Sequence, residues 1–222
     1  MDSPLIVVNF KTYSQSTGEA AVKIAAACRD VAADAGVTIG VAPQLCDIYR
    51  VSSQVDIPVY AQHVDGVSPG SNTGHVMASC VQQAGAVGCL INHSERRLKL
   101  ADIEASVRAA RAEGITTIVC TNNIPTTAAA AALNPEYVAV EPPELIGTGV
   151  PVSQADPEVV RGSVEAVKRI NPDVQVLCGA GISRGEDLTA AMDLGSVGVL
   201  LASGIVKAED PRSALEDLVS QI

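Results

Sequence analysis

Short apolar runs alternate with longer amphipathic segments along almost the whole chain. Eight of the apolar runs are rich in Val, Ile, Leu and Ala and are bounded by Gly, Pro, Asn or Asp. This pattern is typical of parallel strands that are buried on both faces. The predicted strands span residues 5–10, 37–43, 57–63, 86–93, 115–121, 137–142, 174–179 and 197–202.

The segments between these runs contain residues that typically begin and end helices. In one of them we expect Asp102 to cap the N-terminus and Gly114 to follow the last turn. In another, Asp156 is the expected cap and Pro157 the first helical residue. Both have an apolar stripe at helical spacing, formed by Ile103, Val107 and Ala110 in the first and by Val159, Val160, Val164 and Val167 in the second.

Eight strands that alternate with helices predict a (β/α)8 barrel. The 222 residues suit one such domain spanning 1–222, and no linker or shift in composition marks a second domain. A doubly wound sheet is the structural alternative. Its dinucleotide-binding form would place a G-x-G-x-x-G turn after the first strand, where this chain instead has "NFKTYSQ" at 9–15.

Charge and composition narrow the possible partners. The formal charge is −10, which argues against wrapping nucleic acid or docking on an anionic membrane. An anionic ligand must therefore be held by local groups. The sequence also lacks an apolar run long enough to span a membrane and a positively charged leader, so we expect a cytoplasmic protein without membrane partners.

The cysteines and two of the histidines do not indicate a metal site. The six cysteines are scattered without C-x-x-C pairs, and we expect small, buried, reduced side chains instead of disulfides. His63 and His75 lack the spacing of zinc ligands, so a structural or loop role is expected. We predict neither a metal nor a cofactor.

Chemically versatile residues gather where the predicted strands end. In a (β/α)8 barrel these ends meet on one rim, where catalytic residues lie. The rim would hold Asn9, Phe10 and Lys11 after the first strand, His93, Ser94 and Glu95 after the fourth, Glu141 after the sixth, "CGAGIS" at 178–183 after the seventh and "LLASG" at 200–204 after the eighth.

These groups predict one kind of reaction when they act together. A carboxylate such as Glu141 can remove a proton from a carbon next to a carbonyl, while His93 and Lys11 stabilise the charge that develops on the oxygen. The glycine-rich loops, with Ser183 and Ser203 nearby, can bind phosphate through backbone N–H groups. The rim therefore predicts an isomerase that acts on a small phosphorylated carbonyl compound.

Six motifs carry a family resemblance across essentially the whole chain. They are "NFK" at 9–11, "AQH" with "SNTGH" within 61–75, "NHSERR" at 92–97, "VEPPELIGTG" at 140–149, "CGAGIS" at 178–183 and "GVLLASG" at 198–204. Together they resemble the triosephosphate isomerase family, in the compact form found in archaea. The resemblance implies interconversion of D-glyceraldehyde 3-phosphate and dihydroxyacetone phosphate, in glycolysis and gluconeogenesis, without a cofactor.

The resemblance also implies a role for each matching residue. Glu141 matches the general base and His93 the electrophile, and a short helical turn expected at "SERR" would favour its neutral form. Asn9 and Lys11 match groups that position and polarise the substrate, and Glu95 braces the site. The implied substrate and phosphate contacts are Asn9, Phe10, Lys11, Ile146, Gly147, Gly181, Ala202 and Ser203, and residues 142–149 match the lid that closes over the phosphate.

The chain departs from the bacterial and eukaryotic pattern of this family at two places. It has Thr121-Asn122-Asn123 after Cys120, where that pattern has I-G-E, and Glu144 after the second proline, where that pattern has tryptophan. Both departures and the short chain fit the archaeal form, which implies a homo-oligomer, expected to be a tetramer. The "SNTGH" loop matches one that enters a neighbouring subunit's site, with Thr73 as the expected contact.

Two other functions are compatible with parts of this pattern. Another phosphate-binding barrel, of the indole-glycerol-phosphate or thiamine-phosphate type, would share the glycine-rich loops. The reactions of those barrels do not require Lys11, His93 and Glu141 at one site. A non-catalytic barrel that binds phosphorylated metabolites would also keep the loops, but it would not need the carboxylate at position 141.

Overall fold

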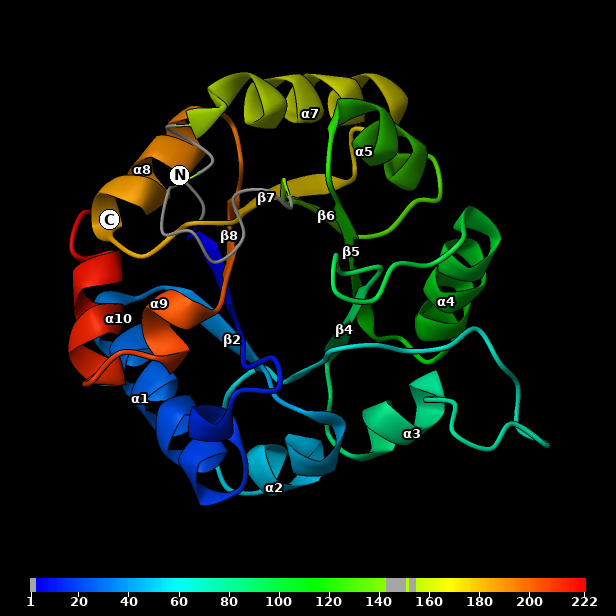
Figure 1. Cartoon of the computed structure of the whole chain (residues 1–222), viewed down its shortest axis with the longest axis horizontal. Coiled ribbons are helices and arrows are strands. Elements are labelled where there is room, and N and C mark those ends of the chain that lie inside the picture. Colours follow the sequence, from blue (N-terminus) through cyan, green and yellow to red (C-terminus); the bar gives the residue numbers. More distant parts are fainter. Residues whose placement is uncertain (1–2, 143–150, 152–154) are drawn as a thin grey trace.

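The computed structural model describes residues 3–142, 151 and 155–222, and it has the expected (β/α)8 architecture. All strand pairs are parallel, in the order β2-β1-β8-β7-β6-β5-β4-β3, and helices surround the strands (Figure 1). The strands are β1 (Leu5–Asn9), β2 (Thr38–Ala42), β3 (Tyr60–Ala61), β4 (Gly88–Ile91), β5 (Thr116–Thr121), β6 (Tyr137–Val140), β7 (Gln175–Gly179) and β8 (Gly198–Leu201).

The junction between β2 and β3 differs from the expected pattern. The sequence predicts a strand over 57–63, but β3 contains only Tyr60 and Ala61. Val41 closes the barrel here through a single bridge to Val59 and an N–H that donates to the carbonyl of Pro58. Pro58 has no N–H with which to extend the pairing, so an apolar run forms a shorter strand than its length suggests.

The alternation of side chains along the strands creates two apolar layers. One layer holds Leu5 and Val7 of β1 with their counterparts on other strands, and the other holds Ile6 and Val8 together with the covering helices. Successive side chains on a strand point to opposite faces, so the two layers are the barrel interior and the space beneath the helices. The same alternation directs Asn9 to the interior face at the end of β1.

The helices occupy the connections between strands. The described ones are α1 (Glu19–Ala35), α2 (Ile48–Ser52), α3 (Ala78–Gln83), α4 (Leu100–Ala112), α5 (Ile124–Ala131), α7 (Pro157–Ile170), α8 (Gly185–Asp193), α9 (Ser203–Val206) and α10 (Pro211–Val219), with short 3-10 turns at Ser14–Ser16 and Leu45–Asp47. The expected start of α7 is confirmed, since the Asp156 side chain accepts from the N–H of Val159 and Pro157 is the first helical residue.

The expected cap of α4 is wrong. This helix begins two residues before Asp102, with Lys99 as the residue that precedes its first turn. Asp102 instead lies inside the first turn, where its charge still favours the positive end of the helix dipole. The predicted buried stripe of this helix is confirmed, and Gly114 follows its end with a left-handed φ of 68°.

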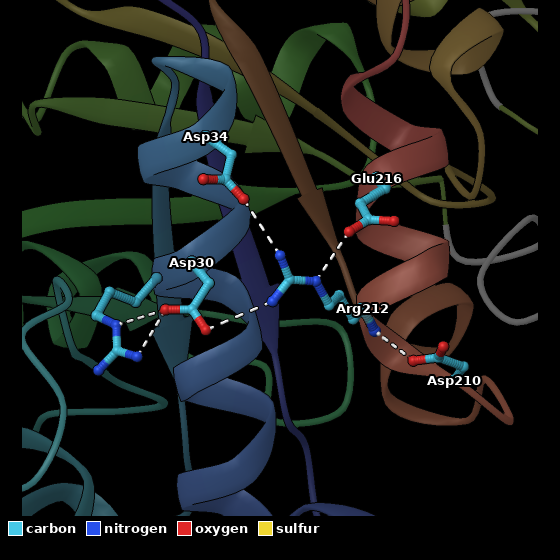
Figure 2. Close-up of polar contacts among 6 residues, drawn as sticks. Asp30, Asp34, Asp210, Arg212 and Glu216 are labelled. Atoms are coloured by element: carbon cyan, nitrogen blue, oxygen red, sulfur yellow. Dashed lines mark hydrogen bonds and ion pairs between the residues drawn. The ribbon is translucent and has the colours of Figure 1, made fainter.

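Helices from the two ends of the chain are joined by charged side chains. Arg212 of α10 contacts Asp30 and Asp34 of α1, and it also pairs with Glu216 on its own helix (Figure 2). Its backbone N–H donates to the Asp210 side chain, which caps α10. Since α1 follows the first strand and α10 follows the last, this network connects the two ends of the chain on the outside of the barrel.

The cysteines only partly follow the expectation. All six are free, and Cys28, Cys89, Cys120 and Cys178 are buried. Cys46 and Cys80 are exposed, which corrects the expectation that every cysteine is a buried apolar side chain. These two lie in a 3-10 turn and a short helix, where one face of the element points to solvent. Within the described ranges, no helix is long and apolar enough to cross a membrane.

Candidate active site

The end of β1 places a lysine at the mouth of the barrel. Asn9 is 4% exposed, and its Oδ1 accepts a hydrogen bond from the N–H of Lys11 at 2.9 Å. This short turn holds Lys11 at a left-handed φ of 47°, a conformation that costs a non-glycine residue energy. Gln62 supports the turn, since its Nε2 donates to the carbonyls of Lys11 and Ala42.

The loop after β4 fixes the orientation of His93. The Nδ1 atom of this buried ring accepts a hydrogen bond from the backbone N–H of Glu95 at 3.2 Å. A ring nitrogen that accepts is unprotonated, so the neutral ring carries its proton on Nε2. The expected helical turn at "SERR" is instead a non-helical turn, closed by the N–H of Arg96 and the carbonyl of His93.

Glu141 follows β6 and is almost completely enclosed. Its exposed fraction is 6%, and its backbone N–H donates to the carbonyl of Thr121 at 2.7 Å. Burial raises the pKa of its carboxyl group, although the nearby His93, a hydrogen bond with Cys120 and the charge of Lys11 oppose this effect. A carboxylate with a raised pKa in a cleft is suited to proton transfer.

The last residue of β7 leaves room for the Glu141 side chain. A Cβ atom at Gly179 would lie 2.4 Å from Cγ of Glu141 and 3.0 Å from one of its carboxylate oxygens. Any side chain at this position would therefore displace the carboxylate. This glycine leaves room for the Glu141 side chain because it has no side chain of its own.

The side chains of His93 and Glu141 face each other across the rim. Nε2 of the histidine lies 3.6 Å from Oε2 of the glutamate, which exceeds hydrogen-bond distance. Among the described residues, these two atoms are the buried side-chain nitrogen and oxygen atoms without a hydrogen-bond partner. Buried polar atoms are normally satisfied, so this pair is placed to contact a ligand.

A cavity of about 280 Å³ opens beside these two groups. Lys11 lies along its wall, 9% exposed, with Nζ 3.0 Å from Oε1 of Glu95. Residues 180–183 and 200–204 also line the cavity, and they include the start of the short helix α9. The cavity is thus lined by a cation, an imidazole, a carboxylate and two loops of small residues.

The small-residue loops contain three of the predicted phosphate positions, Gly181, Ala202 and Ser203. Gly181 has a left-handed φ of 75°, and Ala202 precedes the first turn of α9, which begins at Ser203. First-turn N–H groups have no partner within their own helix. Ser183 lines the cavity near these loops, as expected, and its N–H donates to the Asp187 side chain at 2.9 Å.

The remaining predicted site residues are distributed differently. The Phe10 side chain is fully buried in the layer beneath the helices, so only its backbone could touch a ligand. Thr73 is exposed in the segment between β3 and α3, which extends beyond the ring of helices (Figure 1). Ile146 and Gly147 lie outside the described residues, as does most of the expected lid.

Three residues of the site were not singled out by the sequence. Gln62 supports Lys11, Cys120 contacts Glu141, and Tyr13 lines the cavity with Nζ of Lys207 at 4.3 Å from the centre of its ring. Gln62 lies within the "AQH" motif, which offered a signal for it. Cys120 and Tyr13 resemble ordinary core and loop residues, and only the folded chain brings them to the site.

Comparison with known proteins agrees with this geometry. The family model described as triosephosphate isomerase matches residues 4–222. The chain belongs to the triosephosphate isomerase family. Archaeal members with this name are 73% identical over 219 residues in Methanococcoides burtonii and 68% identical over 219 residues in Methanosarcina acetivorans, each covering 99% of both chains. A member from Methanocaldococcus jannaschii is 57% identical over 218 residues, covering 98% of this chain and all of the relative.

Family membership confirms the resemblance and the barrel predicted from the sequence, and it names an isomerase activity for the relatives. The roles of individual residues are not part of that result. Within the described ranges, no group of three or more His, Cys, Asp or Glu side chains could hold a metal ion. The expectation that no metal or cofactor takes part remains a prediction.

Proposed function

We propose that this chain interconverts D-glyceraldehyde 3-phosphate and dihydroxyacetone phosphate, with Glu141 as general base and His93 as electrophile. The observation that carries this proposal is the facing pair of buried, unpartnered atoms, Nε2 of His93 and Oε2 of Glu141, beside a cavity lined by Lys11. Proton removal next to a carbonyl requires a base on the carbon and a hydrogen-bond donor on the oxygen, and this pair supplies both.

The Glu141 carboxylate removes a proton from the carbon next to the carbonyl; the electron pair of that C–H bond forms a C=C bond, and the π pair of the carbonyl moves to its oxygen. His93 Nε2–H and the Lys11 ammonium stabilise the resulting enediolate. A proton then passes from the hydroxyl oxygen to the former carbonyl oxygen, with His93 Nε2 as the group placed to relay it. Glu141 returns its proton to the former carbonyl carbon, which completes the exchange of aldehyde and ketone without oxidant or reductant.

The tautomer of His93 suits this role. Its Nδ1 accepts from the backbone N–H of Glu95, so Nε2 carries the proton that points toward the cavity. A neutral imidazole with its proton on Nε2 can donate this N–H to the oxyanion that develops on the substrate. Lys11 adds a positive charge, and its contact with Glu95 and the turn from Asn9 hold that charge at the cavity wall.

We assign the phosphate group to the two loops of small residues that line the cavity. Backbone N–H groups at Gly181, Ala202 and Ser203 would bind its oxygens, which suits a protein of net negative charge. We extend the binding site to Ile146 and Gly147 on the basis of the lid motif alone. Closure of this lid would exclude water from an enediolate that otherwise loses phosphate.

A coupled spectrophotometric assay tests this proposal directly. Purified protein is incubated with D-glyceraldehyde 3-phosphate, a chelator and a dehydrogenase that consumes dihydroxyacetone phosphate together with NADH. We expect rapid, chelator-insensitive oxidation of NADH. Folded protein that produces no dihydroxyacetone phosphate would reject the isomerase and favour a barrel that only binds phosphorylated metabolites.

We also propose that the active form is a homo-oligomer, with a tetramer as the expected state. A cavity of about 260 Å³ next to the site is lined by Lys11, Gln62, His93 and Glu95, and we assign it to Thr73 of another copy. Asp65 joins the two ends of the segment that carries Thr73. Its Oδ2 accepts a hydrogen bond from the N–H of Val76, and its Oδ1 lies 2.9 Å from Nε2 of His63.

This assembly predicts a linked loss of association and turnover. Replacing the exposed Thr73 by Arg would introduce a long charged side chain at the proposed contact, and we expect at least about a tenfold loss of kcat together with dissociation. Sedimentation velocity and the coupled assay measure the two effects. A fully active monomer, of the wild type or of this variant, would contradict the assignment.

A further inference from the structure

We propose that Asn92 is a positioning residue that sets the spacing between the two proton-transfer groups; this inference rests on the function proposed above. Asn92 follows β4 and directly precedes His93, with a left-handed φ of 62°. Asparagine tolerates this conformation better than most residues, and glycine tolerates it best. The backbone alone would therefore favour glycine, which leaves the side chain to explain the asparagine.

The Asn92 side chain closes the loop that carries His93. Its Oδ1 accepts a hydrogen bond from the N–H of Leu98 at 2.8 Å. Residues 92–98 are thereby joined end to end, and this segment contains both His93 and the Glu95 N–H that orients its ring. A loop held at both ends keeps the imidazole in one place before a ligand arrives.

The other half of the same amide connects this loop to the next strand. Asn92 Nδ2 donates to the carbonyl of Cys120 on β5 at 2.9 Å. The Cys120 side chain lies beside the Glu141 carboxylate and opposes the rise in pKa that burial causes there, and the two residues line one cavity together with Asn92. Asn92 therefore connects the loop that carries the electrophile to the strand residue that lies beside the base.

Packing alone does not fix the carboxylate of Glu141. A second cavity, of about 260 Å³, lies on the side where Asn92, Cys120 and Asn122 line the wall, and Glu141 borders this cavity as well as the first one. A side chain between two cavities has fewer neighbouring atoms to restrain it. The position of Cys120, which Asn92 holds through its carbonyl, therefore matters for a carboxylate that has room to move.

Asn134 provides a matched comparison within the same chain. It is also an asparagine with a left-handed φ, of 59°, and it lies in the exposed connection between α5 and β6. Its side-chain oxygen accepts from Nδ2 of Asn171, away from the cavity. Asn92→Gly and Asn134→Gly therefore remove comparable side chains from comparable backbone conformations, and only the first lies beside His93.

The experiment compares kcat, KM and the imidazole nitrogen signals of His93 in both variants. For Asn92→Gly we expect kcat to fall about tenfold or more with KM within about threefold, because the reacting groups lose alignment. In histidine-labelled protein, the distinct signals of its protonated and unprotonated nitrogens should shift or broaden. Asn134→Gly should keep kcat within about twofold of wild type and leave those signals unchanged.

Asn92→Asp tests the two halves of the amide separately. The carboxylate keeps an acceptor for the N–H of Leu98 but loses the donor to the carbonyl of Cys120. We expect a loss of kcat in this variant too, which guards against poor folding of the glycine variant. If kcat and the His93 signals remain as in wild type in both variants, the proposal is overturned. An inactive wild type would reject the isomerase alone, since the nitrogen signals still report on positioning.

Discussion

Replacement of Glu141 by Gln is expected to reduce kcat by about 1,000-fold or more, because the amide keeps the shape of the side chain and removes the base. The coupled assay measures the loss of turnover. Titration with inorganic phosphate measures binding at the two loops of small residues, and this affinity should change little. An interaction made only in the transition state has this signature.

Glu113→Gln is a suitable control for this variant. Glu113 is exposed at the end of α4, where the helix returns to the opposite end of the barrel from the catalytic rim. Its replacement changes the net charge by the same amount and should leave kcat unaltered. If Glu141→Gln lost phosphate binding and turnover equally, the carboxylate would have a binding or folding role instead.

The raised pKa of Glu141 adds a prediction about pH. Burial raises this pKa, so the acid side of the kcat/KM profile should lie at higher pH than for an ordinary glutamate. Between the pKa values of the unfolded and folded chain, the native state binds more protons. Its stability therefore falls as pH rises through that window.

Glu141→Gln should accordingly unfold at a higher temperature than wild type at neutral pH. Gln carries no charge to bury, so the destabilisation by the ionised carboxylate is absent. The difference should disappear below about pH 4, where the carboxyl group is protonated in both states. Thermal unfolding followed by circular dichroism at two pH values measures this effect. A lower stability of the variant at neutral pH would contradict the assignment of burial as the dominant cause.

Replacement of His93 by Gln is expected to reduce kcat by about 100-fold, the size of effect seen when one oxyanion donor is lost. The amide can still donate a hydrogen bond, but its N–H is not held in place by the bond between Nδ1 and the N–H of Glu95. Stabilisation by this residue grows as charge develops on the substrate oxygen. The loss should therefore appear in kcat more than in KM.

Inorganic phosphate binding and thermal unfolding provide the controls for His93→Gln. Phosphate affinity should stay within about twofold of wild type, since the proposed phosphate contacts are backbone N–H groups of Gly181, Ala202 and Ser203 and not the imidazole. A variant that loses phosphate affinity in proportion to kcat would show that His93 shapes the whole cavity. A variant with wild-type kcat would reject its role as electrophile.

The accuracy of the sequence predictions depended on how local the relevant interactions are. The strands were predicted because a short apolar run favours a buried strand through its own residues. The start of α7 was predicted because Asp156 and Pro157 favour a helix N-terminus within a few residues. Lys11, His93 and Glu141 were brought together correctly because a parallel barrel collects all strand ends on one rim. Asp102 was misplaced because several nearby backbone groups compete for a polar side chain at the start of a helix.

Other features depend on contacts between distant segments. The exposure of Cys46 and Cys80 depends on which face of a short helix or turn finds a neighbour. The shortening of β3 depends on pairing with strands on either side. A residue's neighbours in the sequence carry little information about either property.

The sequence by itself determined the barrel, the family and the chemical character of the rim, because hydrophobic period, turn residues and strand-end side chains are all written in linear order. Only the tertiary structure decided that Nε2 of His93 and Oε2 of Glu141 face each other without partners, that Gly179 makes room for the carboxylate, and that Asn92 reaches Cys120. These relations join different strands, and their distances exist only once the chain closes into a barrel.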